Sequence, residues 1–197
     1  LDARAEINTA DKQKLTPLMH SINLGNIDFS RALIAAQADV ACVSSRKTPL
    51  TCAAASGDLN AIRMLINAKA IVDAGRPTPL MLAAKGGYEK AVRVLLNANA
   101  APEDRSSSPP LHHAIEGGKP RIVKTLLAAK AQLQATDDEV VRRADALTVA
   151  ARYGNTAIMK ILIDAKAPLE RVDPQTTSLE WIIGLNTPLA TAIRNGH

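Results

Sequence analysis

A short motif recurs along the chain and constrains its fold more than any other feature. The tripeptide Thr-Pro-Leu ends at four leucines, and two weaker copies, Pro-Pro-Leu and Asp-Ala-Leu, end at two more: Leu18, Leu50, Leu80, Leu189, Leu111 and Leu147. A glycine stands seven residues after every one of these anchors: Gly25, Gly57, Gly87, Gly118, Gly154 and Gly196. Because the chain has only 10 glycines in 197 residues, this spacing identifies a true internal repeat.

Each repeat unit is predicted to be a pair of helices. Threonine before proline supplies an N-cap hydroxyl, and proline is well tolerated at the first helical position. The glycine is expected to end this helix with a positive φ and to turn the chain back. The second helix carries apolar residues at i, i+3 and i+4, as in Ile62, Leu65 and Ile66 and in Met159, Leu162 and Ile163. One pair cannot bury its own stripe, so the pairs must stack.

Helix–turn–helix units of roughly 33 residues, opened by Thr-Pro-Leu, resemble the ankyrin repeat. The histidine that the family places after the anchor survives as His112, and its Gly-His pair survives as Gly196-His197. The resemblance covers essentially the whole chain. It implies an all-α solenoid of stacked units, with β-hairpin fingers that are reduced because the first three connections are short. The glycine that usually ends the second helix is replaced in five units: Gln37, Lys69, Asn99, Lys130 and Lys166.

We predict a single ankyrin-repeat array over residues 1–197. Its segments are 1–15 (the end of a preceding repeat), 16–47, 48–77, 78–108, 109–144, 145–186 and 187–197 (the start of a sixth repeat). The inserted loop 168–186 holds Trp181, the only tryptophan. This side chain is expected either to plug the widened gap between two units or to contact a partner, because tryptophan is enriched at binding hot spots. The open ends of the array predict that it is part of a longer chain.

Composition narrows the classes of function. The net charge is +5, 47% of the residues are apolar, and no apolar run reaches the roughly 18 residues of a membrane span. Two cysteines, Cys42 and Cys52, form no disulfide framework and favour a reducing compartment. We therefore expect an intracellular protein, cytoplasmic or inside an organelle after removal of a transit peptide. No metal set, phosphate loop or catalytic triad is recognisable, so neither a cofactor nor enzyme activity is predicted; His112 and His113 are interpreted as structural.

The resemblance implies that fingers and first helices line a concave contact surface. The positions expected to be exposed there are mostly basic, and they supply most of the candidate partner-binding set: Lys12, Lys47, Lys85, Arg105, Glu116, Arg142, Arg152, Tyr153 and Trp181. A regular basic row on the opposite, convex side is interpreted as a solubilising surface: Arg31, Arg63, Arg93, Lys124 and Lys160.

Three functions fit this pattern. The first is a non-catalytic scaffold that binds an acidic protein partner on the basic concave face. The second is a structural subunit of a large multiprotein complex, and the third is the docking or regulatory arm of a larger enzyme or channel. A nucleic-acid binder is disfavoured, because stacking aromatics are missing from the basic face.

Overall fold

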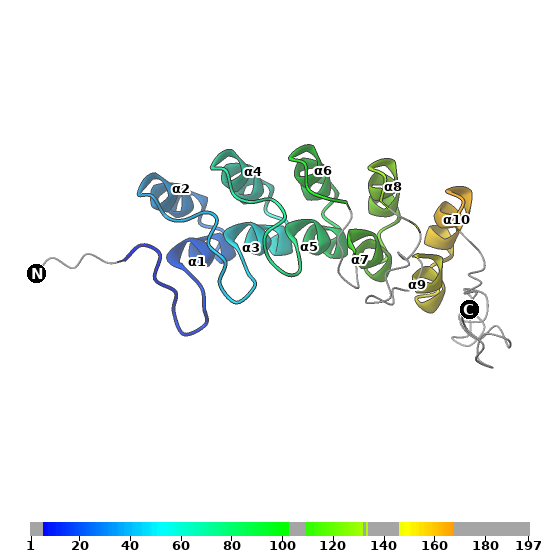
Figure 1. Cartoon of the computed structure of the whole chain (residues 1–197), viewed down its shortest axis with the longest axis horizontal. Coiled ribbons are helices and arrows are strands. Elements are labelled where there is room, and N and C mark those ends of the chain that lie inside the picture. Colours follow the sequence, from blue (N-terminus) through cyan, green and yellow to red (C-terminus); the bar gives the residue numbers. More distant parts are fainter. Residues whose placement is uncertain (1–5, 103–108, 132, 134–145, 168–197) are drawn as a thin grey trace, which may run out of the picture. The chain divides into compact units, whose positions relative to one another are not determined.

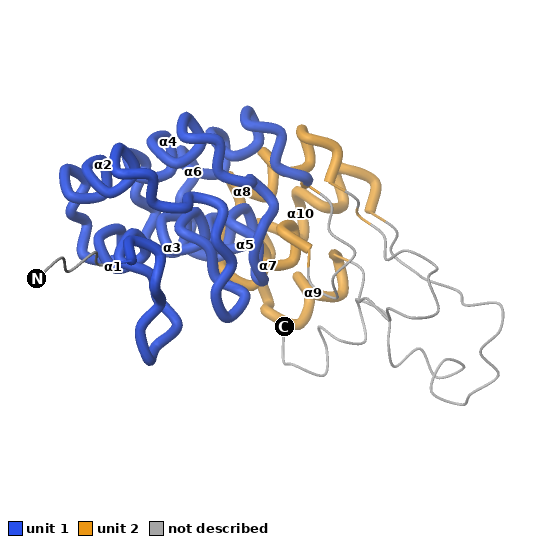
Figure 2. The backbone as a smooth tube through the Cα atoms, turned by 60° about the vertical axis from the view of Figure 1, so that its left-hand side comes forward, with its two compact units in different colours: residues 1–101 blue, residues 102–197 orange. Residues whose placement is uncertain are grey.

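The computed structural model describes residues 6–102, 109–131, 133 and 146–167. Its elements are short helices, and the chain divides into two compact units, residues 1–101 and 102–197 (Figure 2). Unit 1 holds three helix pairs: α1 (Pro17–Asn23) with α2 (Ile27–Ala35), α3 (Pro49–Ser56) with α4 (Leu59–Asn67), and α5 (Pro79–Gly86) with α6 (Glu89–Asn97). The helices of unit 2 are α7 (Pro110–Glu116), α8 (Pro120–Ala128), α9 (Ala146–Arg152) and α10 (Thr156–Asp164).

The helix pairs of unit 1 stack in two layers. The first helices α1, α3 and α5 pack side by side in one row, and the second helices α2, α4 and α6 form the other row (Figure 1). In unit 2, α7 packs on α9 and α8 on α10. The predicted all-α arrangement of stacked helix pairs is confirmed.

The Thr-Pro-Leu motif starts the first helices as predicted. The hydroxyls of Thr16, Thr48 and Thr78 each accept a hydrogen bond from the backbone N–H three residues later, over 3.4, 3.1 and 3.4 Å. The anchor leucines that follow are buried, with Leu50 and Leu80 completely excluded from solvent. The motif therefore sets both the start of the helix and the face that it buries.

The second helices end in a left-handed residue, as expected at the positions where the ankyrin repeat usually has glycine. The five residues that replace the expected glycine have φ between 62° and 68°: Gln37, Lys69, Asn99, Lys130 and Lys166. The alanine after each donates its N–H to the carbonyl of the buried leucine five residues before it, as Ala70 does to Leu65 over 3.0 Å. This is the hydrogen bond of a Schellman motif. The alanine itself is buried in all five units, and this burial explains why a small residue recurs there.

The apolar stripes of α4, α6 and α8 are buried in their first two positions, whereas in α10 the first position, Met159, is only half-buried. Ile62 and Leu65 are fully buried, whereas the third position, Ile66, is only half-buried. In α10, Leu162 is fully buried but Ile163 is 46% exposed. The third position lies at the edge of the packed surface. The stripe predicts that Ile163 is part of the core, and the structure shows that it is not.

Candidate functional site

Three loops of unit 1 precede its first helices, and we call them the fingers. Finger 1 comprises the described residues 6–15, finger 2 residues 39–47 and finger 3 residues 71–77. Fingers 1 and 2 extend below the row of α1 and α3 in Figure 1. They are reduced hairpins: the β-bridge between Ser44 and Lys47 in finger 2 is the β-pairing found in the described part of the chain.

Finger 2 ends in a tight two-residue turn. Ser44 and Lys47 exchange both backbone hydrogen bonds at 2.9 Å, and the two residues between them have positive φ, 49° at Ser45 and 67° at Arg46. Positive φ at both central positions is the pattern of a type I′ turn, which normally selects Asn-Gly. Serine and arginine adopt it at a cost of roughly 1–2 kcal/mol each. The tip therefore holds Arg46 in a strained backbone conformation.

Finger 3 fixes this tip from the side. The N–H of Arg76 donates to the carbonyl of Arg46 over 2.8 Å. Next to it, Gly75 has a φ of 100°, and a Cβ there would lie 3.1 Å from the Arg46 carbonyl oxygen and 2.6 Å from a methyl carbon of Thr51. Only glycine allows this approach, so the second and third fingers are locked together at their backbones.

Asp11 organises finger 1. Its Oδ1 accepts the N–H of Gln13 over 2.8 Å and that of Leu15 over 3.0 Å, and its Oδ2 lies 2.8 Å from Nε2 of His20 on α1. The Leu15 amide, followed by the His20 contact, lowers the pKa of Asp11 below its ordinary value. These contacts favour the ionised carboxylate and hold a loop in which Lys14 has a φ of 62°.

Side chains of the fingers also link successive repeats. Oδ1 of Asn8 accepts the N–H of Asp39 over 2.8 Å, and the carboxylate of Asp73 accepts the N–H of Ala101 over 3.1 Å. The equivalent position between these two is Ala41, which has no side-chain acceptor to offer to the N–H of Ile71. The middle link is therefore missing.

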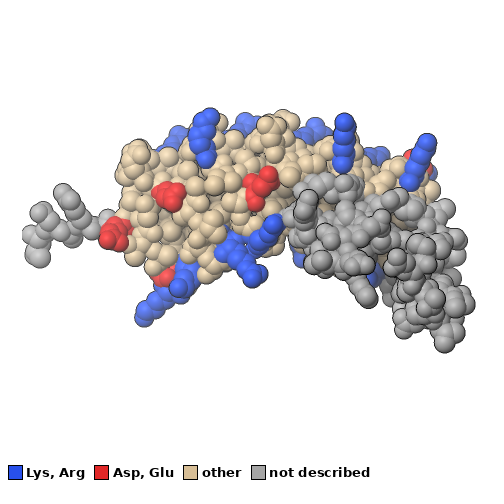
Figure 3. Space-filling view, in the orientation of Figure 1, with Lys and Arg blue, Asp and Glu red and all other residues tan. Residues whose placement is uncertain are grey.

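The acidic residues of the fingers are hydrogen-bonded within the chain. Besides Asp11 and Asp73, Asp39 accepts the N–H of Ala41 over 2.8 Å, and Glu6 accepts the hydroxyl of Thr9 over 2.9 Å. Four basic side chains at the ends of fingers 1 and 2 are instead exposed: Lys12, Lys14, Arg46 and Lys47. We call these four the tip cluster. Figure 3 shows Lys and Arg along this lower edge of unit 1.

The predicted site residues fall in three groups. Lys12 and Lys47 are exposed on fingers 1 and 2, and Lys85 is exposed in the last turn of α5. In unit 2, Glu116 is half-buried at the end of α7, while Arg152 and Tyr153, the latter 50% exposed, lie at the end of the neighbouring α9. Three members lie outside the described residues: Arg105, Arg142 and Trp181.

Sequence reasoning missed half of the tip cluster. Lys14 and Arg46 both stand four residues before an anchor leucine, whereas the prediction considered positions three and six residues before it. The signal that could have found them is the register itself, because Arg76 occupies the same position in the next unit.

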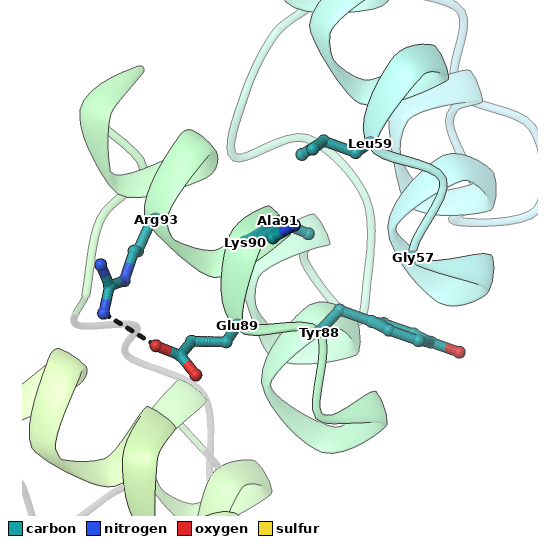
Figure 4. A pocket seen from close by; sticks show the side chains of 7 residues that line it. All are labelled: Gly57, Leu59, Tyr88, Glu89, Lys90, Ala91 and Arg93. Atoms are coloured by element: carbon teal, nitrogen blue, oxygen red, sulfur yellow. Dashed lines mark hydrogen bonds and ion pairs between the residues drawn. The ribbon is translucent and has the colours of Figure 1, made fainter.

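The hollow beside α6 is shaped by Tyr88 (Figure 4). Its ring lies against Gly57 of the preceding repeat and Gly86 of its own, where an added Cβ would come within 2.4 and 2.3 Å of ring carbons. Glu89 and Arg93, paired at 2.7 Å, and Leu59 also line the hollow. Tyr88 stands at the N-cap of α6 without a capping hydrogen bond, so its role there is packing between repeats.

The chemically reactive side chains form no centre in the part of the chain that the structure describes. No group of three or more His, Cys, Asp or Glu there could hold a metal ion. Cys42 and Cys52 are free thiols, and burial raises the pKa of both, so they are protonated at neutral pH. His112 is buried on α7, where its place in the anchor motif predicts a structural role.

None of the described helices is long and apolar enough to cross a membrane.

Comparison with known proteins identifies the family. The model of ankyrin repeats (3 copies) matches residues 1–76, 67–137 and 111–197, so the chain belongs to the ankyrin repeat family. Among solved structures, the crystal structure of the human ASB11 ankyrin repeat domain superposes with a TM-score of 0.79 at 23% identity, covering 96% of this chain and 82% of that one. At this identity the likeness shows the fold alone. No curated protein sequence matches the chain.

Proposed function

We propose that the chain is a non-catalytic scaffold that binds an acidic protein partner through its basic concave face. Ankyrin repeats are in general protein–protein interaction modules. The observation that carries the proposal is the separation of charge in the fingers. Their carboxylates accept hydrogen bonds from the chain's own backbone and side chains, whereas the lysines and Arg46 of the tip cluster extend into solvent. Positive charge on such a face steers acidic partners and contributes to specificity.

Two further observations favour a protein over a nucleic acid as the partner. Proteins that bind single strands stack bases on aromatic side chains, and the three fingers contain no Phe, Tyr or Trp. Tyr153 in unit 2 is half-exposed beside Arg152, and this combination of residues is typical of protein interfaces.

Charge reversal on two faces tests the proposal. A variant with Lys47, Lys85 and Arg152 changed to Glu is compared with a control in which Arg31, Arg63 and Arg93 are changed to Glu. Each immobilised chain is used to capture proteins from cell extract, after circular dichroism has shown that both variants are folded. We expect the wild-type chain and the control to retain a protein that the first variant does not bind. Added salt should release this protein from the wild-type chain. Loss of that protein from the control alone would refute the proposed face.

A second candidate function is a permanent subunit of a larger assembly. Phe29 on α2 is 52% exposed, although the equivalent residues of the next two repeats, Ala61 and Ala91, are fully buried or nearly so. Leu24, in the turn between α1 and α2, is 81% exposed. These apolar surfaces favour a neighbouring subunit on α2. Sedimentation of the isolated chain tests this: a stable monomer that Phe29→Gln leaves unchanged would count against it.

A further inference from the structure

We infer that the tip cluster binds an extended acidic segment of a partner protein, in which carboxylates recur about every third residue. This inference rests on the proposed function and specifies where on the face the acidic segment lies. It depends on two residues that lie outside the predicted site, Lys14 and Arg46.

These two residues combine an unusual backbone conformation with exposure to solvent. Lys14 and Arg46 have φ values of 62° and 67°, and both are exposed at the ends of their fingers. Glycine would be the cheaper residue in such a conformation. Five residues that end second helices have the same positive φ for a structural reason, so the position at a finger end is what distinguishes Lys14 and Arg46. In finger 2 the strain is held by the hydrogen bonds that Ser44, Lys47 and Arg76 make around the tip.

The four cations have no acidic partner within the described chain. The carboxylate closest in sequence, Asp11, accepts the N–H groups of Gln13 and Leu15 and contacts His20. Because that carboxylate already accepts these contacts, it neutralises Lys12 and Lys14, which follow it, only in part. An incoming carboxylate can therefore interact with Lys and Arg side chains that do not have to leave another ion pair.

The spacing of the fingers sets the spacing of the ligand. Fingers 1 and 2 precede α1 and α3, which are packed neighbours, and packed helices lie roughly 8–10 Å apart. An extended chain advances about 3.3 Å per residue, so about three residues span two fingers. Val43 is 61% exposed just before the finger 2 turn and offers an apolar contact between the charged ones.

The chain contains a matched control for the test. Lys69 is a second exposed basic residue with a φ of 67°, but it ends α4 and belongs to no finger. Changing either Arg46 or Lys69 to glycine removes one cation and one left-handed Cβ. Both changes should therefore leave the melting temperature equal or higher, so a loss of binding cannot be attributed to unfolding.

The probe is a fluorescein-labelled peptide with four Glu-Leu-Ser repeats, and binding to the 197-residue chain is followed by fluorescence anisotropy at low salt. We expect Arg46→Gly to weaken binding about threefold and the Lys14→Gly/Arg46→Gly double variant about tenfold. Lys69→Gly should bind as wild type does. The same peptide with Gln in place of Glu should bind much more weakly.

Three results would overturn the inference. These are wild-type affinity in the double variant, an equal loss in Lys69→Gly, or a thymidine 12-mer that binds as tightly as the peptide and displaces it. The double variant could bind the peptide as wild type does while reversal of Lys47, Lys85 and Arg152 still releases the captured partner. In that case the tip cluster is not the binding site of the acidic segment, and the proposed function stands. Loss of the partner only from the convex control would reject the proposed function itself.

Discussion

Gly86→Ala should destabilise the protein, although the same change in most helices is stabilising. Gly86 is the last residue of α5 and needs no left-handed conformation, so alanine would ordinarily gain about 0.5–1 kcal/mol. Here the new methyl group would meet the Tyr88 ring at 2.3 Å. The ring cannot simply shift toward the other side, because Gly57 lies against it there. Overpacking of this kind costs about 1–3 kcal/mol, so we expect a net loss of roughly 0.5–2 kcal/mol.

A double-mutant cycle isolates the contact. In a Tyr88→Ala background the obstacle is gone, and Gly86→Ala should now stabilise the chain by about 0.5–1 kcal/mol. Gly57→Ala is the control: Gly57 has a φ of 71°, so alanine there should remain destabilising in both backgrounds. Urea unfolding followed by circular dichroism gives the free energies. If Gly86→Ala stabilised both backgrounds equally, the ring would not occupy the space above Gly86.

Four further predictions concern the core, the turns and the fingers. Leu95→Ala should lower the free energy of unfolding by about 2–4 kcal/mol, because Leu95 is fully buried on α6; a loss below about 0.5 kcal/mol would place it outside the core. Lys69→Gly should be neutral or raise the melting temperature, and clear destabilisation would show that its turn is not left-handed. Ala41→Asn should stabilise by about 0.5–1.5 kcal/mol in urea unfolding by supplying the missing acceptor for the N–H of Ile71, and slower hydrogen exchange of that amide would confirm the bond. The pKa of Asp11 is lowered in the folded state, so its contribution to stability is present above the ordinary pKa near 4 and is lost as the pH falls below that value. The NMR signals of the finger 1 amides should therefore change as the pH falls below about 4 in wild type and not in Asp11→Ala.

The features that could be read from the sequence are those set within one repeat. Thr48 before Pro49 specifies a helix start through local chemistry, and the structure shows the capping hydrogen bond. The left-handed φ of Lys69 followed from its place in the register, even though lysine itself gives no such signal. In both cases the position in the repeat determines the backbone conformation, and the residue type changes only the free energy needed to adopt it.

Features that depend on a neighbouring repeat could not be read in this way. The positive φ of Arg46 is held by the N–H of Arg76 one finger away, and Ser-Arg is not a recognised turn signature. Gly86 looks like a simple turn residue, and only the direction of the Tyr88 ring shows why a side chain is excluded there. The sequence prediction therefore includes Lys12 and Lys47 of the tip cluster but does not include Lys14 and Arg46.

The claim that the fingers bind acidic protein segments is tested most directly by mapping the bound peptide on the chain. The ¹⁵N-labelled protein is titrated with the Glu-Leu-Ser peptide, and amide chemical shifts are followed at each residue. The largest changes are expected at Lys14, Arg46 and Lys47, with little change at Arg63 and Arg93 on the second helices. Changes confined to the second helices, or none at millimolar peptide, would contradict binding through the fingers.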